Sequence, residues 1–308
     1  MRVLITGGAG FLGAALANRL VAEGHTVLVL DDFTAGDPRR LAPDVLLTRG
    51  DVKDVPKLWT LLQNVGCVYH LAARVRVPES VHYPSDYNDV NVGGTVSLMQ
   101  AMRDTGVRRV VFASSAALYG EQDQQPVSEA QAPNPDSPYG VSKIAAEYYL
   151  STLGALYNIE TVSLRIFNAF GPGQDLPPSY PPVIPHMLRQ AQTGGSLVVF
   201  GDGHQTRDFV YVDDVVDALL AAATASDVNR AVINIGSGKE LSVCDLADKV
   251  TQVTGARVNI LYNQEQSGGV SRLVANVSQA KKLLGWAPWT NLERGLRLIL
   301  ERDPRFRT

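Results

Sequence analysis

Three side chains near the middle of the chain could together take a proton from an alcohol. Tyr139 and Lys143 are four residues apart, so on a helix they share one face, about one turn apart. A phenol with an ordinary pKa of about 10 is a weak base at neutral pH, but a nearby ammonium favours the phenolate. Ser115 ends an apolar run upstream, and its hydroxyl could bind the same substrate oxygen. The three residues predict base catalysis on a hydroxyl group.

Taken one at a time, these signals are weak. A tyrosine and a lysine at this spacing are common by chance, and a serine at the end of a strand often only caps a turn. Their expected place adds weight, because ligands of open α/β sheets bind at the carboxyl ends of the strands.

A glycine-rich turn follows the first apolar run. Gly7, Gly10 and Gly13 form a Gly-x-x-Gly-x-x-Gly pattern that opens a helical stretch. In such a turn one glycine permits the tight bend, another lets the backbone approach a pyrophosphate, and a third lets helix and strand pack closely. The free N–H groups at the helix N-terminus favour phosphate. The pattern predicts a dinucleotide site.

Acidic residues at two further strand ends indicate which dinucleotide is bound. Asp31 closes the second expected strand, where a carboxylate hydrogen-bonds the adenosine ribose hydroxyls. A carboxylate there repels a 2′-phosphate, so NAD is favoured over NADP, and Asp32 supports this. Asp51 follows the third strand and could meet the adenine amino group. The alternative interpretation is that these aspartates only form turns.

The expected elements alternate between strands and helices, which predicts an α/β, Rossmann-type, doubly wound parallel sheet. The expected strands are Arg2–Thr6, Thr26–Asp31, Val45–Arg49, Cys67–His70, Arg109–Ala113 and Thr161–Ile166, and the main helices are Phe11–Glu23, Val92–Arg103 and Tyr139–Leu153. Ser137 is the expected N-cap of the last helix, with Pro138 at its first position. We expect an NAD-binding domain at 1–166, with a return segment at 210–235, and a smaller substrate-binding lobe at 167–308.

Composition excludes several classes of protein. A net charge of −3, with no basic run, gives no footprint for nucleic acid or an acidic membrane surface. Cys67 and Cys244 have no metal-ligand spacing, so we expect reduced thiols, no metal and a cytoplasmic protein. The N-terminus lacks the pattern of a signal peptide, and no apolar run approaches the roughly 20 residues that span a bilayer.

From end to end the chain resembles the extended short-chain dehydrogenase/reductases, and most of all the UDP-glucose and UDP-N-acetylglucosamine 4-epimerases. The resemblance rests on the glycine turn, Leu30-Asp31-Asp32, Gly50-Asp51-Val52, His70-Leu71-Ala72-Ala73, Asn91-Val92-Gly93-Gly94-Thr95, Ser114-Ser115, Tyr139-x-x-x-Lys143, Arg165-Ile166-Phe167-Asn168, Gly171-Pro172-Gly173-Gln174, Val183-Ile184-Pro185, Gly201-Asp202-Gly203, the run from Gln205 to Asp214, and Leu284-Gly285-Trp286.

The resemblance implies a role for each matching residue. Tyr139 would be the base, Lys143 its electrostatic partner and a ribose ligand, and Ser115 the second hydroxyl. Asn168 and Arg207 would hold the substrate diphosphate. The further implied cofactor contacts are Phe11, Leu12, Val52, Leu71, Ala72, Ala73 and Asn91, and Val183 would contact substrate. The implied reaction oxidises C4 of a nucleotide-linked sugar to a ketone and reduces it from the opposite face. The resemblance also implies a homodimer through Val92–Arg103 and Tyr139–Leu153.

Two features separate this chain from relatives. Related 4,6-dehydratases carry an acidic pair after the hydroxyl residue, where this chain has Ala116 and Ala117; the first alanine also disfavours decarboxylases. Where the family has Arg-Pro-Gly-Asp against the nucleotide, this chain reads Gln266-Ser267-Gly268-Gly269. Arg272 would replace the lost positive charge, or it is a solvated surface residue. Leu273 stands at the family's size gate for the sugar and does not decide which sugar fits.

Three functions therefore stay open. The first is epimerisation at C4 of a nucleotide-diphosphate sugar, UDP-hexose foremost. The second is another sugar-nucleotide reaction, such as epimerisation of a uronic acid or a 4-reduction. Of these, only the reduction would consume NADH stoichiometrically. The third is a non-catalytic NAD-binding protein, which would have no need of Ser115, Tyr139 and Lys143 together.

Overall fold

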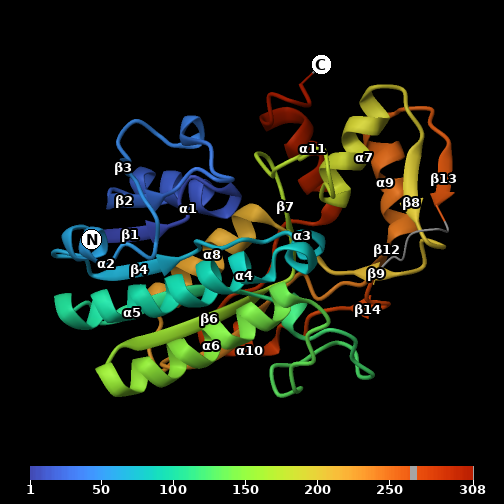
Figure 1. Cartoon of the computed structure of the whole chain (residues 1–308). Coiled ribbons are helices and arrows are strands. Elements are labelled where there is room, and N and C mark those ends of the chain that lie inside the picture. Colours follow the sequence, from blue (N-terminus) through green and yellow to red (C-terminus); the bar gives the residue numbers. More distant parts are fainter. Residues whose placement is uncertain (264–268, 308) are drawn as a thin grey trace.

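The computed structural model describes residues 1–263 and 269–307, and a sheet of seven parallel strands is its largest feature (Figure 1). From edge to edge the strands are β11 (Ala231–Ile235), β6 (Glu160–Ile166), β5 (Arg109–Ser115), β4 (Cys67–His70), β1 (Arg2–Thr6), β2 (Thr26–Asp31) and β3 (Leu46–Arg49). The strand order reverses between β1 and β4, so a ligand-binding crevice is expected outside their carboxyl ends. The predicted fold class is confirmed.

Helices cover both faces of this sheet, and alternate strand residues divide between two apolar clusters. On one face, Val3 and Ile5 pack with α1 (Phe11–Ala22) and α8 (Val212–Thr224). On the other face, Leu4 and Phe112 pack with the three helices α2 (Val55–Leu61), α5 (Gly94–Thr105) and α6 (Pro138–Tyr157). Burial on both sides explains why the strands are continuous apolar runs.

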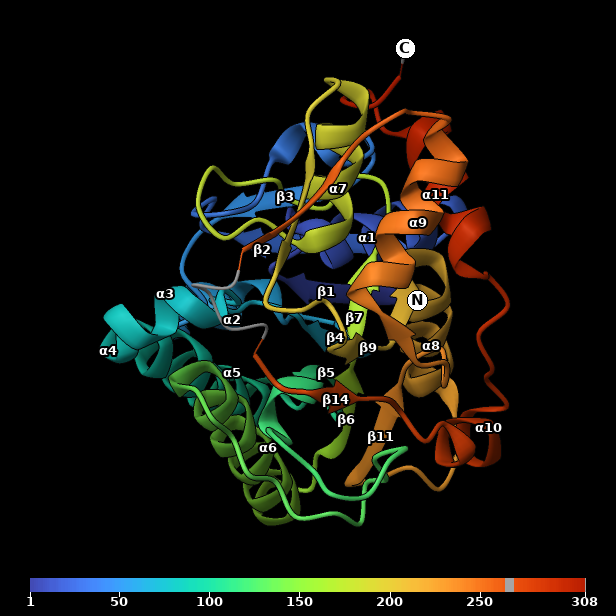
Figure 2. The same cartoon turned by 90° about the vertical axis from the view of Figure 1, so that its right-hand side faces the viewer.

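Most of the remaining elements form the part of the chain that the sequence predicted as a second lobe, on the right of Figure 1 and turned to the front in Figure 2. Here α7 (Val183–Gln192), α9 (Val243–Thr254) and α11 (Leu292–Arg302) share a third apolar cluster with β8 (Leu197–Phe200). The small sheets pair β8 with β13 (Ile260–Asn263), β7 (Asn168–Phe170) with β10 (Phe209–Tyr211), and β9 (Thr206–Arg207) with both β12 (Leu241–Ser242) and β14 (Arg272–Leu273). α10 (Ser278–Leu284) instead contacts β11 of the large sheet and α8, which covers one face of that sheet.

Several expected boundaries differ from the structure by one or two residues, and the ends of two helices have a visible cause. A π-helical turn, η2 (Asn88–Gly93), precedes α5, so the regular helix begins later than predicted. α6 extends to Tyr157, where Asn158 adopts a left-handed conformation (φ 56°) and ends the helix. Short helices α3 (Val77–His82), α4 (Pro84–Tyr87), η1 (Pro38–Arg40) and η3 (Ala116–Leu118) complete the chain. Within the described residues, no helix is long and apolar enough to cross a membrane.

Candidate active site

The glycine-rich turn lies directly against the loop that follows β4. Gly7 has a φ of +70°, and a Cβ there would lie 2.7 Å from the Cα of Ala72. A Cβ on Gly13 would lie 2.2 Å from the carbonyl oxygen of Gly7. Gly10 is the N-cap of α1 and offers no side-chain cap, so the N–H groups of that end face no competing side chain. The geometry forms a cradle that fits a pyrophosphate.

Asp31 ties this turn to the end of β2. Its carboxylate accepts hydrogen bonds from the N–H groups of Ala9 and Phe33, both at 2.9 Å. Burial raises the pKa of Asp31, and these two bonds oppose the shift. Asp32 is exposed and caps a turn by accepting from the N–H and hydroxyl of Thr34.

Asp51 and Val52 follow β3, as predicted, but their contacts are local. Asp51 accepts from the N–H of Lys53 and lies 3.6 Å from its ammonium, which is the turn role weighed from the sequence. Val52 is buried against Gly94 at the start of α5.

A buried chain of hydrogen bonds links the end of β1, beside the glycine-rich turn, to the loop after β4 and to the start of α5. Nothing in the sequence predicted it. The N–H of Ala72 donates to Thr6 Oγ1 (3.3 Å), and the Thr95 hydroxyl donates to the carbonyl of Asn91 (2.6 Å). His70 lies between the two threonines, at 2.8 and 2.9 Å. Burial lowers the pKa of His70 to about 3, so the ring is neutral. Nε2 therefore carries the proton and donates to Thr95, while Nδ1 accepts from Thr6.

Asn91 connects the loop after β4 to the predicted catalytic helix. Its side-chain amide exchanges two hydrogen bonds with the backbone of Arg74, at 2.8 and 3.0 Å, and donates to Ser142 Oγ at 2.8 Å. The Ser142 hydroxyl donates in turn to the carbonyl of Tyr139. Leu71, Ala72 and Ala73, the cofactor contacts implied by the resemblance, lie on this loop, and the N–H of Leu71 donates to the carbonyl of Thr6 at the end of β1.

The predicted catalytic side chains meet at the N-terminal part of α6. Ser137 is the N-cap, as expected, with Pro138 at the first position. The hydroxyl of Ser80 on α3 accepts from the N–H of Tyr139 at 3.2 Å, a contact with no signal in the sequence. Tyr139 and Lys143 are buried, with exposed fractions of 8% and 3%.

The surroundings shift both ionisable groups. Burial raises the pKa of Tyr139, and a hydrogen bond with Ser115 opposes this. Burial lowers the pKa of Lys143 to about 7, and the charge of Glu147 opposes that shift. The Lys143 ammonium also lies 4.3 Å from the centre of the Phe112 ring. A phenol, a hydroxyl and a cation of near-neutral pKa suit proton transfer at an alcohol.

Ser115 ends β5 and serves two purposes. Besides bonding Tyr139, its Oγ accepts from the N–H of Ala117 at 3.2 Å, which caps η3. The next two side chains, Ala116 and Ala117, hold no ionisable group. Leu273 and Phe167 pack into the same apolar cluster as Ala116, so segments from the expected substrate lobe contact this strand end.

The residues expected to bind the diphosphate, Arg207 and Asn168, lie on the short strands β9 and β7. Arg207 donates from Nη1 to the carbonyls of Thr206 (2.8 Å) and Val270 (2.7 Å), and burial lowers its pKa. Asn168 starts β7 and donates to the carbonyl of Asp208 at 3.1 Å. Val183 is the first residue of α7 and is half-buried.

Arg272 is held by Glu240 through two hydrogen bonds of 2.7 and 2.8 Å, and Glu240 also accepts from Thr206 Oγ1. Gln266, which stands where the family has arginine, lies outside the described residues. Gly269 is described, has a φ of +75°, and lies close to the Arg207 guanidinium.

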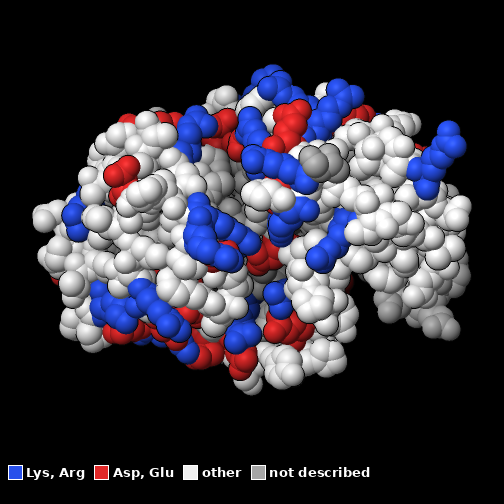
Figure 3. All heavy atoms as spheres, turned by 90° about the horizontal axis from the view of Figure 1, so that it is seen from above, with Lys and Arg blue, Asp and Glu red and all other residues white. Residues whose placement is uncertain are grey.

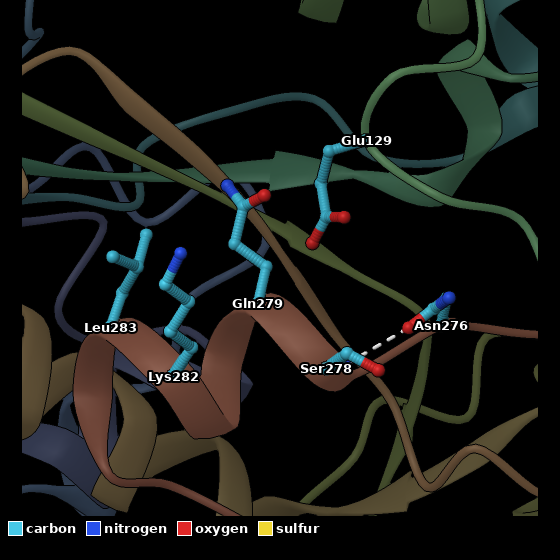
Figure 4. A pocket seen from close by; sticks show the side chains of 6 residues that line it. All are labelled: Glu129, Asn276, Ser278, Gln279, Lys282 and Leu283. Carbon is cyan, nitrogen blue, oxygen red and sulfur yellow. Dashed lines mark hydrogen bonds between the residues drawn. The ribbon is translucent and has the colours of Figure 1, made fainter.

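A hollow of about 400 Å³ lies apart from these groups, along β11 at the edge of the large sheet (Figure 4). Its walls are Glu129, Asn276, Ser278, Gln279, Lys282 and Leu283, none of which is a predicted site residue. Glu129 accepts from the N–H of Asn234 and Gln279 donates to the carbonyl of Val232, so these side chains cover the open strand edge. Because no predicted site residue lines this hollow, the groups around Tyr139 remain the candidate active site.

The charge pattern adds one observation. On the face in Figure 3, basic and acidic side chains lie intermixed over its centre, with no large area of one sign.

In residues 1–263 and 269–307, no group of three or more His, Cys, Asp or Glu side chains could hold a metal ion.

Comparison with known proteins identifies a family and several similar enzymes. Residues 3–236 match the model of the NAD dependent epimerase/dehydratase family. The chain is 35% identical to a UDP-glucose 4-epimerase of Mycolicibacterium smegmatis, over 98% of each chain. It is similar to the structure of the Thermotoga maritima UDP-glucose 4-epimerase with UDP-glucose (33% identity, TM-score 0.93, 98% of each chain). MoeE5 in complex with UDP-glucuronic acid and NAD is also similar (36% identity, TM-score 0.87, 98% of each chain).

Proposed function

Because this chain belongs to the NAD dependent epimerase/dehydratase family, we propose that it is an NAD-dependent 4-epimerase of a nucleotide-linked sugar. The observation that carries the proposal is the meeting of Ser115, Tyr139 and Lys143 at the carboxyl end of the sheet, next to the glycine cradle. A non-catalytic NAD-binding protein would not need a buried lysine of lowered pKa beside a buried phenol.

The cradle fits NAD. Gly7, Gly10 and Gly13 leave room for a pyrophosphate, and the carboxylate of Asp31 would accept from the adenosine ribose. NAD bound here supplies the hydride acceptor, and later the donor, for C4 of the sugar. The loop of Leu71, Ala72 and Ala73, fixed by Thr6 and His70, would form the wall behind it.

The chain's own residues handle the proton. Tyr139 takes the proton of the sugar O4 as C4 is oxidised and returns it when the 4-keto group is reduced from the opposite face. Ser115 hydrogen-bonds the same oxygen, and the charge of Lys143 favours the phenolate. Ala116 and Ala117 offer no acid or base for eliminating water, so the reaction ends at inversion of C4.

We propose Arg207 and Asn168 as diphosphate ligands, with Val183 beside the nucleotide. A guanidinium binds phosphate through two parallel hydrogen bonds, and burial of Arg207 strengthens its electrostatic interaction with an anion. UDP-hexose is the first candidate, because two of the similar proteins named above are UDP-glucose 4-epimerases. UDP-glucuronic acid is the second, because similar MoeE5 has been crystallised with both UDP-glucuronic acid and UDP-glucose.

Three further parts of the proposal concern the oligomeric state, the location and the division into domains. A homodimer through α5 and α6 is supported by large apolar side chains that α6 exposes: Val141, Tyr148, Tyr149 and Leu156. A cytoplasmic location is supported by two cysteines that form no disulfide. The division into 1–166 with 210–235 and 167–308 is supported by the entry of β11 into the large sheet, although α10, from the second part, also contacts that sheet.

Proton NMR of the purified protein with a panel of UDP-, dTDP-, GDP- and CDP-sugars, including UDP-glucuronic acid, tests the proposal. We expect one of them to give a C4-epimer signal without added cofactor, because NAD is regenerated in each cycle. Stoichiometric consumption of added NADH would instead show a reductase. No product in any reaction, with NAD or NADH supplied, would refute the proposal for these sugars.

A further inference from the structure

A third polar residue continues the catalytic row along α6. Tyr139, Lys143 and Glu147 are spaced four residues apart, so they lie on one face of the helix. All three are buried, and the exposed fraction of Glu147 is 4%. A buried carboxylate one turn beyond a buried ammonium needs an explanation, because burial of either charge is costly without a partner.

Glu147 is held from two strands. The Ser114 hydroxyl on β5 donates to Oε1. Arg165 on β6 donates from Nε to Oε1 at 3.1 Å and from Nη2 to Oε2 at 2.8 Å. Ser114 and Arg165 are paired neighbours in the register of β5 and β6, so the sheet itself fixes the carboxylate.

The anchoring extends to the edge of the sheet. Arg165 also donates to the hydroxyl of Tyr119 at 2.8 Å, and that hydroxyl donates to Asn234 Oδ1 on β11 at 2.7 Å. The N–H of Asn234 donates to Glu129, beside the hollow of Figure 4. A continuous hydrogen-bonded chain therefore runs from the strand edge to the carboxylate next to Lys143.

Other charged groups around α6 face partners of their own. Glu79 on α3 and Asp86 on α4 lie near Arg74, and Asp89 on η2 pairs with Lys53. Arg103 and Asp104 on α5 pair with each other. His70 on β4 is neutral at physiological pH, and Arg165 on β6 is bound to Glu147. Glu147 is thus the carboxylate placed to act on Lys143.

We infer that Glu147 is a positioning residue for the reaction: anchored by Ser114 and Arg165, it keeps the side chain of Lys143 charged and in place beneath Tyr139. This inference rests on the proposed function only for the role of Lys143 in turnover. A buried ion pair contributes little net stability, because desolvation offsets most of its attraction. The position of Glu147 one turn from Lys143 is better explained by its attraction for the Lys143 ammonium.

The direction of the effect follows from the charges. Burial lowers the pKa of Lys143 to about 7, and Glu147 opposes the shift. Loss of the negative charge lowers the pKa of Lys143 further, so the ammonium is lost at lower pH. The phenolate of Tyr139 then loses its cation, and turnover falls on the alkaline side of the pH profile.

The test titrates Lys143 in the NAD-bound protein, using the ¹³Cε and ¹⁵Nζ NMR shifts of labelled lysine, with Lys143→Arg to assign the signal. In Glu147→Gln we expect the Lys143 pKa to fall by about one unit or more. The alkaline limb of kcat should move by the same amount. The titration needs no sugar, so it tests the inference even if no substrate is turned over and the proposed function fails.

Two further variants keep the test decisive. Ser114→Ala is the matched control: it removes one hydrogen bond to Glu147 but no charge, so the pKa of Lys143 should change much less. If Glu147→Gln does not fold, Glu147→Gln with Arg165→Met replaces the ion pair by neutral groups, and the pKa of Lys143 should fall in the same direction but by less, because the opposing charge of Arg165 is removed as well. An unchanged Lys143 titration in whichever of these variants folds, or an equal shift in Ser114→Ala, would overturn the inference.

Discussion

Two regions of the molecule each hold an arginine that binds a glutamate through two nitrogens, and they differ in burial. In the catalytic region, formed by α6, β5 and β6, the side chains of Arg165 and Glu147 are 6% and 4% exposed. In the substrate rim, formed by β9, β12 and β14, those of Arg272 and Glu240 are 54% and 34% exposed. In both pairs a guanidinium donates from Nε and Nη2 to a carboxylate, and the pairs differ most in their contact with water.

That difference separates two tasks. A buried pair cannot exchange its partner for water, so Glu147 and Arg165 keep one geometry and can hold a proton-transfer site in place. An exposed pair is screened by solvent and salt and is worth little, so Arg272 can leave Glu240 for another anion at small cost. Under the proposed function, the interior fixes the groups that transfer the proton, whereas Arg272 would meet the nucleotide from a surface that can rearrange.

The largest effect should come from the catalytic region. Tyr139→Phe removes the base, and kcat should fall by about 10³-fold, while NAD and nucleotide sugar still bind. Steady-state turnover and calorimetric binding measure the two properties separately. Tyr262→Phe on β13 is the matched control, because that side chain is 50% exposed and lies outside α6 and the proposed dimer helices. Near-normal turnover in Tyr139→Phe would remove this residue from the role of base.

The two ion pairs themselves can be compared by unfolding in urea. Arg165→Met leaves the buried Glu147 carboxylate without its cation and should lower the free energy of unfolding by about 3–5 kcal/mol. Arg272→Met should leave the urea midpoint unchanged within error, because that pair is exposed. Equal losses in the free energy of unfolding in the two variants would show that burial does not separate the two ion pairs.

The cofactor end of the sheet should respond more moderately. Asp31→Ala removes the acceptor for the ribose, and the Kd of NAD should rise about tenfold, the equivalent of one hydrogen bond to a charged group. The preference against NADP should shrink, because the carboxylate that repels a 2′-phosphate is gone. Asp32→Ala is the control, since Asp32 is exposed and caps Thr34. Unchanged discrimination in Asp31→Ala would place the ribose elsewhere.

Sequence reasoning succeeded where the chemistry is local. The glycine spacing, the Ser137 cap and the four-residue interval between Tyr139 and Lys143 each follow from a single turn or helix, and the structure places them as predicted. The apolar runs likewise predicted six of the seven strands of the large sheet, and in five of them burial on both faces leaves a plain signal, whereas the edge strand β3 is mostly exposed.

What the sequence missed depends on contacts between distant segments. Ser80 beneath Tyr139 and the neutral His70 between two threonines are ordinary residue types with no pattern around them. Glu147 lies on the predicted catalytic face, but its importance appears only when β6 places Arg165 against it. For Arg272 the sequence left two interpretations, and its ion pair with Glu240 adds a partner that neither had included.

The smallest effect, and the finest test of the comparison, concerns Arg272. If this guanidinium moves from Glu240 to the substrate diphosphate, Arg272→Ala should raise KM by a few fold at low salt and leave kcat unchanged. Glu240→Gln should act in the opposite direction, because it frees the guanidinium and removes a carboxylate that competes with the phosphate. Both effects should fade as ionic strength rises and shortens the screening length. Identical KM values for the wild type and both variants at low salt would show that the pair in the substrate rim stays closed and that Arg207 supplies the cation for the diphosphate.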